Sequence, residues 1–305
     1  MAALLDKRLA FVTGKGGVGK TTVAYALGLA AVAAGKRAIV CEIASQERGS
    51  ALFRRAPIGF AETELEDGLW AISIDPDAMV REYLEMLLPV RAMASLLHRS
   101  NLFAYLAAAT PGLREVVTAG KAYELTLDER RAPGQSRTYD VVIVDAPATG
   151  HGVGFLEAPG TFGRIARGGP LADQARRIEA MITDPAATGV AVVAIPEEMA
   201  VNESAELADA LAAAGVALDD VIVNGLFPDR FSAAELARIR AADADLGDAA
   251  LAAAIAEAER ARTQRRELER LRSLLGDGAV RELPFLFSPG FGRAELERLA
   301  AEVAL

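Results

Sequence analysis

A glycine-rich segment near the N-terminus carries residues that could bind phosphate. Residues 11–28 read FVTGKGGVGKTTVAYALG, and the stretch from Gly14 to Thr21 has the spacing G-x-x-x-x-G-K-[ST]. A β-type apolar run precedes the stretch and a helical pattern follows it, so backbone N–H groups can turn inward around phosphates at a helix N-terminus. In such a loop Lys20 reaches the β- and γ-phosphates of a nucleotide, and the Thr21 hydroxyl binds Mg²⁺.

An acidic residue that could complete this site ends a buried-strand pattern further along the chain. In YDVVIVDAPATGHGVGFL, residues 139–156, Asp145 closes the apolar run. We expect Asp145 to hold the coordination shell of Mg²⁺, partly through water, as Walker-B acids do. The loop containing Gly150, Gly152 and Gly154 would then sense the γ-phosphate. An acid after a buried strand is common, so this prediction depends on its pairing with the phosphate loop.

Lys15 is a second cation in the phosphate loop, where a simple loop needs one. From the residues alone, it is more typical of a solvent-facing loop lysine. Lys20 by itself indicates only that phosphate is bound.

Short apolar runs alternate with longer helical stretches, and this pattern predicts an α/β fold. Several runs are apolar throughout, which indicates a mostly parallel, doubly wound sheet. Together with the glycine-rich phosphate motif after the first run, this predicts a P-loop nucleoside triphosphatase fold. Because the composition never shifts sharply, residues 1–305 are interpreted as a single domain. The predicted strands are residues 9–13, 37–41, 69–74, 140–145, 190–195, 220–224 and 279–283.

Two long helical stretches interrupt this alternation. Residues 76–137 far exceed a normal crossover and are predicted to form an inserted helical subdomain. Residues 232–275 are Ala-rich and acidic and form a second predicted helical segment. Its last part is strongly charged, so we expect that helix to face solvent.

Composition excludes several classes of function. The chain has 33 Lys and Arg against 42 Asp and Glu, a formal net charge of −9, which argues against nucleic acid as a partner. Cys41 is the single cysteine, which excludes a disulfide framework, a four-cysteine zinc site and an iron–sulfur cluster held by this chain's own thiolates. No stretch approaches the roughly 18 apolar residues of a membrane span, and MAALLDKR lacks a signal-peptide core. We therefore expect a cytoplasmic protein without a direct membrane anchor.

Several motifs together resemble one known family. GKGGVGKTT, with its second lysine, and DAPATGH resemble the deviant Walker A (SIMIBI-class) branch of P-loop ATPases. Three further stretches are similar to motifs of its ArsA-like subgroup, which includes the arsenite-pump ATPases and the targeting ATPase for tail-anchored membrane proteins. These are TPGLREVVTAGKAYEL (110–125), VIVNGLFP (221–228) and LPFLFSPGFGRAEL (283–296).

The resemblance implies ATP or ADP and Mg²⁺ as cofactors and ATP hydrolysis as the reaction. It places Lys15 across a dimer interface, on the partner's phosphates, so that two chains enclose two nucleotides. A cation acting in this way can contribute on the order of 10³–10⁵ in rate. The implied catalytic set is Lys15, Lys20, Glu42 and Asp145, with Thr21 and Asp145 at the metal. The implied nucleotide-binding residues are Gly16, Gly17, Val18, Gly19, Lys20, Thr21 and Thr22 at the phosphates, and Asn224, Pro284, Phe285, Leu286 and Phe287 at the adenine.

The sequence departs from the family pattern at switch I and at the zinc clasp. CEIASQERGSALF (41–53) places Glu42 where the family has a water-orienting Asp, and a degraded switch I with slow hydrolysis is the alternative. Residues 225–275 contain no cysteine or histidine, so a zinc clasp between two chains is excluded. Met and Leu in YLEMLLPVRAMASLL could bind an apolar helix of a client protein, or pack the insertion's own core.

Three functions remain open at this point. The leading one is a dimeric ATPase switch that couples nucleotide state to a client through the helical insertion, as a homodimer or a heterodimer with a paralogue. A second is a regulatory or scaffolding subunit that binds nucleotide and hydrolyses little of it. The third is a positioning ATPase of the MinD or ParA kind, which the acidic ELERLAAEVAL terminus and the net charge disfavour.

Overall fold

An eight-stranded sheet runs through the part of the chain that the computed structural model describes, residues 2–43, 47–80, 112–128, 138–147, 151–166, 168–246, 249–276 and 280–304. The strand order is β3-β4-β2-β5-β1-β6-β7-β8. The strands are β1 (Leu9–Gly14), β2 (Ala38–Glu42), β3 (Thr63–Glu66), β4 (Leu69–Ser73), β5 (Val141–Asp145), β6 (Thr188–Ala194), β7 (Leu218–Leu226) and β8 (Val280–Pro284).

All neighbouring strands pair in parallel except β3 and β4, which pair antiparallel at one edge. The central strands β1, β2, β5 and β6 are buried along their whole length, which is why their sequences are apolar runs and do not alternate. This confirms the predicted mostly parallel α/β fold. The edge strand β3 was not predicted, because its sequence, TELE, has no apolar run.

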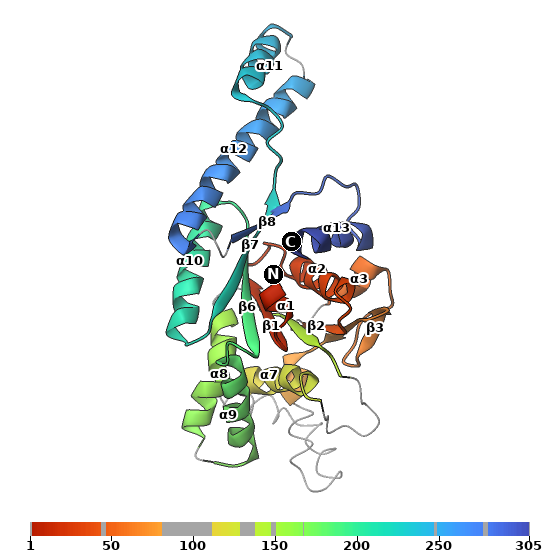
Figure 1. Cartoon of the computed structure of the whole chain (residues 1–305), viewed down its shortest axis with the longest axis vertical. Helices are drawn as coiled ribbons and strands as arrows, with labels where there is room; N and C mark the ends of the chain where they lie inside the picture. Colours follow the sequence, from red (N-terminus) through yellow and green to blue (C-terminus); the bar gives the residue numbers. More distant parts are fainter. Residues whose placement is uncertain are drawn as a thin grey trace.

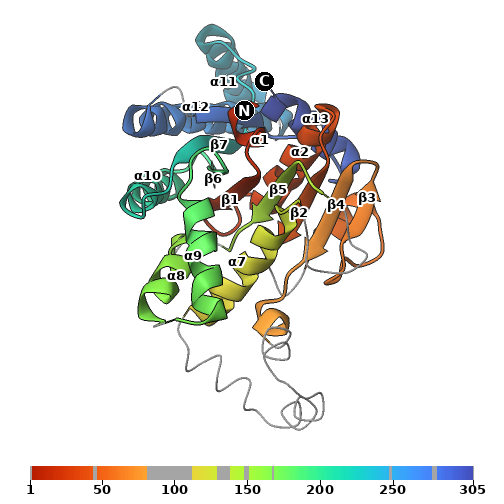
Figure 2. The ribbon, with the colours of Figure 1, turned by 60° about the horizontal axis from the view of Figure 1, so that its bottom comes forward.

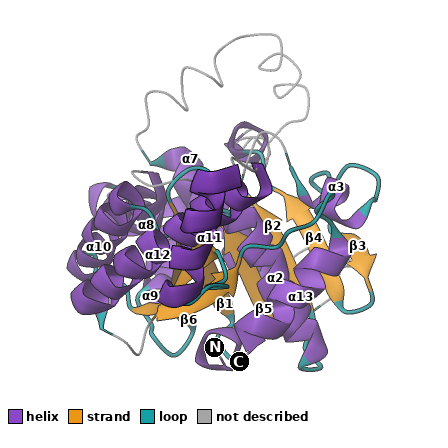
Figure 3. Ribbon diagram, turned by 90° about the horizontal axis from the view of Figure 1, so that it is seen from above, coloured by secondary structure: helices purple, strands orange, loops and turns teal. Residues whose placement is uncertain are grey.

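Helices cover both faces of the sheet (Figure 3). On one face, α1 (Ala2–Leu5), α2 (Lys20–Ala33) and α13 (Arg293–Ala304) share an apolar core with the strands. On the other face, the core is shared by α7 (Leu113–Leu125), α8 (His151–Ile165), α9 (Pro170–Ile182), α10 (Glu198–Ala213) and α12 (Ala249–Leu275). The short helix α3 (Gly49–Phe53) follows β2.

The helix α7 is the longest described part of the predicted insertion, residues 76–137. It packs against α8, α9 and β5 (Figure 2), and Val116, Val117 and Leu125 are buried there. The apolar side of α7 is therefore covered by other elements of the same chain. Residues 81–111 and 129–137, which include the Met-rich stretch, lie outside the described residues.

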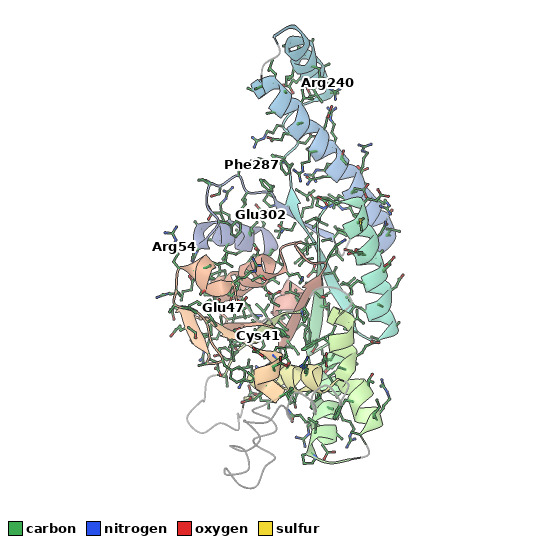
Figure 4. All side chains as sticks on the ribbon, turned by 180° about the vertical axis from the view of Figure 1, so that it is seen from behind. Cys41, Glu47, Arg54, Arg240, Phe287 and Glu302 are labelled. Atoms are coloured by element: carbon green, nitrogen blue, oxygen red, sulfur yellow. The ribbon has the colours of Figure 1, made fainter. Side chains whose placement is uncertain are left out.

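The helices α11 (Ala233–Leu246) and α12 form an arm that projects from the body beyond the ends of β7 and β8 (Figure 1). Arg240 of α11 donates to Glu259 of α12 at 2.7 Å near the outer end. Arg240 and Phe287 mark the tip and the base of this arm in Figure 4. The inner half of α12 packs against α10 and β7, so this charged helix, expected to face solvent, has a buried side. No helix within the described ranges is long and apolar enough to cross a membrane.

Candidate functional site

The carboxyl ends of the parallel strands bring the predicted site residues to one edge of the sheet. The phosphate loop follows β1, Glu42 ends β2, Asp145 ends β5, and Asn224 lies near the end of β7. Glu42 is the register partner of Asp145, and Val12 of β1 pairs with Asp145 on the other side. Ligands of open α/β sheets bind at this edge, outside the strand ends.

The phosphate loop has a backbone that only glycine permits at its two ends. A Cβ on Gly14 would lie 2.2 Å from the carbonyl oxygen of Val193, and Gly14 has a φ of 144°. Gly19 has a φ of 95° and is the N-cap of α2, which begins at Lys20. Between them Gly16 and Gly17 are exposed and Val18 is buried. The loop thus presents a solvent-facing backbone at a helix N-terminus, the arrangement that binds phosphate.

The Lys20 side chain folds over this loop. Its Nζ donates to the carbonyl oxygen of Lys15 at 3.0 Å. Burial lowers the pKa of the Lys20 amine, and the nearby Asp145 carboxylate acts in the opposite direction. An ammonium held at the centre of the loop can move to phosphate oxygens by a change of side-chain rotamer.

Thr21 and Asp145 lie together at the start of α2. The Thr21 hydroxyl donates to Asp145 Oδ2 at 2.5 Å, and Asp145 is 8% exposed. Burial raises the pKa of Asp145 to about 6; the Thr21 hydrogen bond opposes this and the Glu42 charge adds to it. The second oxygen, Oδ1, is buried and has no hydrogen-bond partner among the described residues. The Thr21 hydroxyl and the Asp145 carboxylate, one oxygen of which is buried without a donor, fit the oxygen ligands that Mg²⁺ uses.

Lys15 is paired within its own chain. Its Nζ lies 2.7 Å from Oε1 of Glu203, a residue of α10, and both side chains are about one-third exposed. The two chain positions are 188 residues apart, so the fold places a carboxylate beside the second lysine of the loop.

The Glu42 carboxylate is buried and holds switch I. It accepts hydrogen bonds from the Tyr25 hydroxyl at 2.7 Å and from the backbone N–H groups of Arg48 at 2.7 Å and Gly49 at 2.9 Å. Glu42 is 2% exposed. A Cβ on Gly49 would lie 1.9 Å from the Tyr25 hydroxyl, so this arrangement is closely packed. In this conformation the carboxylate caps the start of α3.

Glu47, the second acidic residue of switch I, also accepts hydrogen bonds from residues that follow it in the chain. Its oxygens accept from the backbone N–H of Ser50 at 2.9 Å, the Ser50 hydroxyl at 2.5 Å and the N–H of Ile58 at 3.3 Å. Residues 44–46 of switch I, and 148–150 of the DAPATGH motif, lie outside the described residues.

The predicted adenine-binding residues form the far end of the site. Asn224 Nδ2 donates to the carbonyl oxygen of Val18 at 2.9 Å, so it binds the phosphate loop directly. Beyond it, the rings of Phe227, Phe285 and Phe287 form a cluster with centroid distances of 4.6 to 5.4 Å. A groove of about 490 Å³ lies beside this cluster, lined also by Pro284. Leu286 packs against the core under α2, and Thr22 is half-buried in the first turn of that helix.

The structure therefore brings most of the predicted site residues to one edge, and it adds partners that sequence reasoning missed. Glu203 and Tyr25 are such partners; each lies on a helix in which no motif singles it out. Phe227 lay inside the quoted VIVNGLFP motif, and an aromatic residue directly after the strand end was a usable signal.

Comparisons with known proteins find relatives among ATPases. The family described as anion-transporting ATPase matches residues 7–167 and 170–246. The ATPase BagA of Mycobacterium tuberculosis is 31% identical over 78% of this chain and 71% of its own length. A putative arsenical pump-driving ATPase of Halobacterium salinarum is 28% identical over 73% of this chain and 35% of its own length. The ATPase GET3 of Chaetomium globosum is 24% identical over 98% of this chain and 92% of its own length.

Proposed function

The chain belongs to the family of anion-transporting ATPases, and from this we propose that it is a nucleotide-gated switch, in which two chains close around ATP and relax when it is hydrolysed to ADP and phosphate. The observation that carries the proposal is the group formed by Lys20, Thr21 and Asp145. The Lys20 ammonium, the Thr21 hydroxyl and the Asp145 carboxylate meet at the N-terminus of α2, below an open glycine loop. A helix N-terminus, a cation and a magnesium-binding pair are what a nucleoside triphosphate requires.

Each residue has a part in the proposed reaction. The backbone from Gly16 to Gly19 holds the phosphates, and Lys20 leaves the Lys15 carbonyl oxygen to bind the β- and γ-phosphates. Thr21 and Asp145 would hold Mg²⁺, which neutralises negative charge on the phosphate oxygens when it is bound. Asn224 and the Pro284–Phe287 segment border the adenine.

The dimer is the part of the proposal that depends on Lys15. In one chain Lys15 is paired with Glu203, and closure of two chains would exchange this partner for phosphate oxygens of the nucleotide in the other chain. The second chain can be identical or a paralogue. With no cysteine in residues 225–275 to bind zinc, the nucleotides and apolar contacts would hold the two chains together.

Client binding is assigned to the insertion. Because the apolar side of α7 is packed against α8 and α9, and Met79 and Val80 are buried in the core, an apolar helix or protein client would contact other parts of the insertion. The cytoplasm is the proposed location.

A second candidate is a nucleotide-binding scaffold subunit with little hydrolysis. The Glu42 contacts favour it, because a carboxylate that already accepts hydrogen bonds from Tyr25, Arg48 and Gly49 has only about one of its four acceptor sites left to orient water. Turnover measured for the chain alone and with a paralogous partner separates the two candidates. A positioning ATPase would instead sediment with DNA or liposomes when ATP is present.

The test of the proposal is nucleotide-dependent thermal stabilisation. ATP with Mg²⁺ at 100 times its Kd should stabilise the wild-type chain by about 2.7 kcal/mol, and Lys20→Ala should abolish the shift. Lys36→Ala is the matched control, since Lys36 lies before β2 at the opposite edge of the sheet and binds the Leu5 carbonyl oxygen. Equal stabilisation of wild type and Lys20→Ala would overturn the proposal.

A further inference from the structure

One buried amide on the arm contacts the backbone of the nucleotide site. Gln264 lies in α12, within the charged stretch AERARTQRRELERL, and is 6% exposed. Its Nε2 donates to the carbonyl oxygen of Gly225 at 3.2 Å, and its Oε1 accepts from the N–H of Phe227 at 2.8 Å. A side-chain amide that holds both a donor and an acceptor of one short backbone segment fixes the conformation of that segment.

The backbone needs these two bonds because the strand ladder is interrupted there. The register of β7 on β8 shifts between Val223 and Leu226, and Gly225 has a φ of 78°, in the left-handed region. Such a bulge turns backbone groups away from the neighbouring strand. Gln264 binds one group inside the bulge, the Gly225 carbonyl oxygen, and one directly after the strand, the Phe227 N–H. A buried polar group without a partner would be unfavourable.

The bulge separates the two ends of the nucleotide site. On one side, Asn224 donates to the carbonyl oxygen of Val18 in the phosphate loop. On the other side, the Phe227 ring is stacked on Phe285, with a centroid distance of 4.6 Å and an interplanar angle of 21°. Arg260, one turn before Gln264 on α12, has its guanidinium carbon 4.9 Å from the Phe227 ring centroid. The same helix therefore fixes the backbone of Phe227 and contacts its ring.

The helix α12 is also fastened to the rest of this edge. Arg272 donates to Glu282 of β8 at 2.8 Å, and Arg265 pairs with the same glutamate. Arg270 donates to Asn202 of α10, the residue before Glu203, which pairs with Lys15. The outer half of α12 carries α11 (Figure 1). The helix α12 therefore contacts both ends of the site and also carries α11.

We propose that Gln264 is a positioning residue for the nucleotide base, and that through it the base-binding end of the site and the α11–α12 arm order one another. Its amide holds the Gly225 bulge so that Asn224 and Phe227 keep their places on either side of it. The proposal rests on the proposed function in one respect, that ATP binds at the phosphate loop. It adds a residue and a coupled element that the phosphate-binding motif does not contain.

The proposal separates recognition of the base from recognition of the phosphates. Gln264→Met keeps the side-chain length and removes the hydrogen bonds that Gln264 makes to the Gly225 carbonyl oxygen and the Phe227 N–H. We expect the Kd for ATP to rise about tenfold, the size of effect typical of a lost buried hydrogen bond. The Kd for inorganic tripolyphosphate should stay within about twofold of wild type, because Lys20 and Thr21 are untouched. Glu269→Gln on the exposed side of α12 is the matched control and should change neither constant.

The experiment is calorimetric titration of the full chain with ATP and, separately, with tripolyphosphate, both with Mg²⁺. A selective loss of ATP affinity in Gln264→Met supports the inference. Unchanged binding of both ligands, or an equal loss of both, overturns it. If the wild type binds neither ligand, the proposed function fails with it; if the wild type binds both, only the inference is at stake.

Hydrogen exchange of the wild type gives a test that needs no variant, should Gln264→Met not fold. Saturating ATP should slow exchange in residues 224–227 and in residues 256–268 of α12, and tripolyphosphate should slow it in the phosphate loop alone. Slowed exchange in α12 with ATP supports the coupling. Exchange in α12 that is the same with and without ATP overturns it.

Discussion

Lys15 and Glu203 form an ion pair at 2.7 Å between the phosphate loop and α10. Both side chains are about one-third exposed, and pairs of this kind contribute about 0–1 kcal/mol because water and salt screen them. The pair is therefore easily exchanged. A triphosphate brought close by a second chain would offer Lys15 a denser negative charge than one carboxylate.

This relationship predicts that Glu203→Gln favours the closed dimer. Without its partner Lys15 would be free to meet phosphate, and the ATP concentration needed for half-maximal dimerisation should fall about two- to fivefold, the equivalent of up to about 1 kcal/mol. Sedimentation velocity over a range of ATP concentrations measures this. Lys15→Ala should abolish the ATP-dependent dimer. Glu206→Gln, an exposed position one turn further along α10, is the control. A Glu203→Gln chain that dimerises less readily than wild type would contradict the exchange of partners.

A second prediction compares two glycines of the phosphate loop without nucleotide. Gly17 and Gly19 have φ values of 86° and 95°, so alanine at either position should cost about 1–2 kcal/mol of backbone strain. A Cβ on Gly19 would also lie 2.3 Å from Asn224 Nδ2, whereas a Cβ on Gly17 meets nothing within 4 Å. Gly19→Ala should therefore lose about 1–2 kcal/mol more than Gly17→Ala, since it displaces the Asn224 bond to Val18. Urea unfolding of both variants measures the difference, and equal losses would show that the Asn224 contact contributes nothing.

The sequence predicted the strands and the strand ends well, for a physical reason. Strands buried on both faces must be apolar throughout, and a phosphate loop or a metal-binding acid must follow such a strand directly. Asp145, Lys20 and Thr21 could be predicted from the sequence for this reason. Glu203 and Gln264 could not be predicted from the sequence. Glu203 is 188 positions from Lys15 and Gln264 is 39 positions from Gly225, and no period or spacing relates the residues of either pair. Gln264 was further concealed by the charged residues on the exposed side of its helix. The role of Glu42 depends on hydrogen bonds from Tyr25 and Gly49, which no local pattern could reveal.

A third prediction separates two roles for Glu42. As an anchor of switch I, Glu42 and its donor Tyr25 act together, so Glu42→Gln and Tyr25→Phe should each lose about 1–3 kcal/mol of stability. Both should also speed tryptic cleavage after the exposed Arg48, because the start of α3 is released. Glu64→Gln, on the exposed side of β3, is the control.

Turnover of the same variants tests the catalytic alternative. If Glu42 anchors switch I, the two substitutions should lower turnover by similar factors. If it orients the attacking water, Glu42→Gln alone should lose about 10²–10⁴ in turnover, while Tyr25→Phe keeps most of it. The contacts of Glu42 favour similar losses of turnover in both variants. A large loss in Glu42→Gln alone, with unchanged stability, would contradict the anchoring role.

The last prediction concerns Asp145 and the metal. Its pKa is raised to about 6, chiefly by burial, so at pH 8 the folded chain holds an ionised carboxylate in an unfavourable environment. Asp145→Asn removes that charge and keeps an oxygen that can accept from Thr21. At pH 8 and without ligand, the variant should be more stable than wild type by about 1–2 kcal/mol, given that one pKa unit corresponds to about 1.4 kcal/mol and that the hydrogen bond to a neutral amide is weaker.

The same substitution should remove the dependence of ATP binding on Mg²⁺. In wild type, adding EDTA should reduce the thermal shift caused by ATP; in Asp145→Asn the shift should be small and the same with or without EDTA. Asp140→Asn is the matched control, since Asp140 precedes β5 at the opposite edge of the sheet and binds the backbone N–H of Arg37. A variant that is less stable than wild type would mean that the Thr21 hydrogen bond and the charges of Lys20 and Arg48 outweigh the cost of burying the carboxylate. A variant that keeps a full Mg²⁺-dependent shift would place the metal elsewhere, because a neutral amide is a much weaker magnesium ligand than a carboxylate.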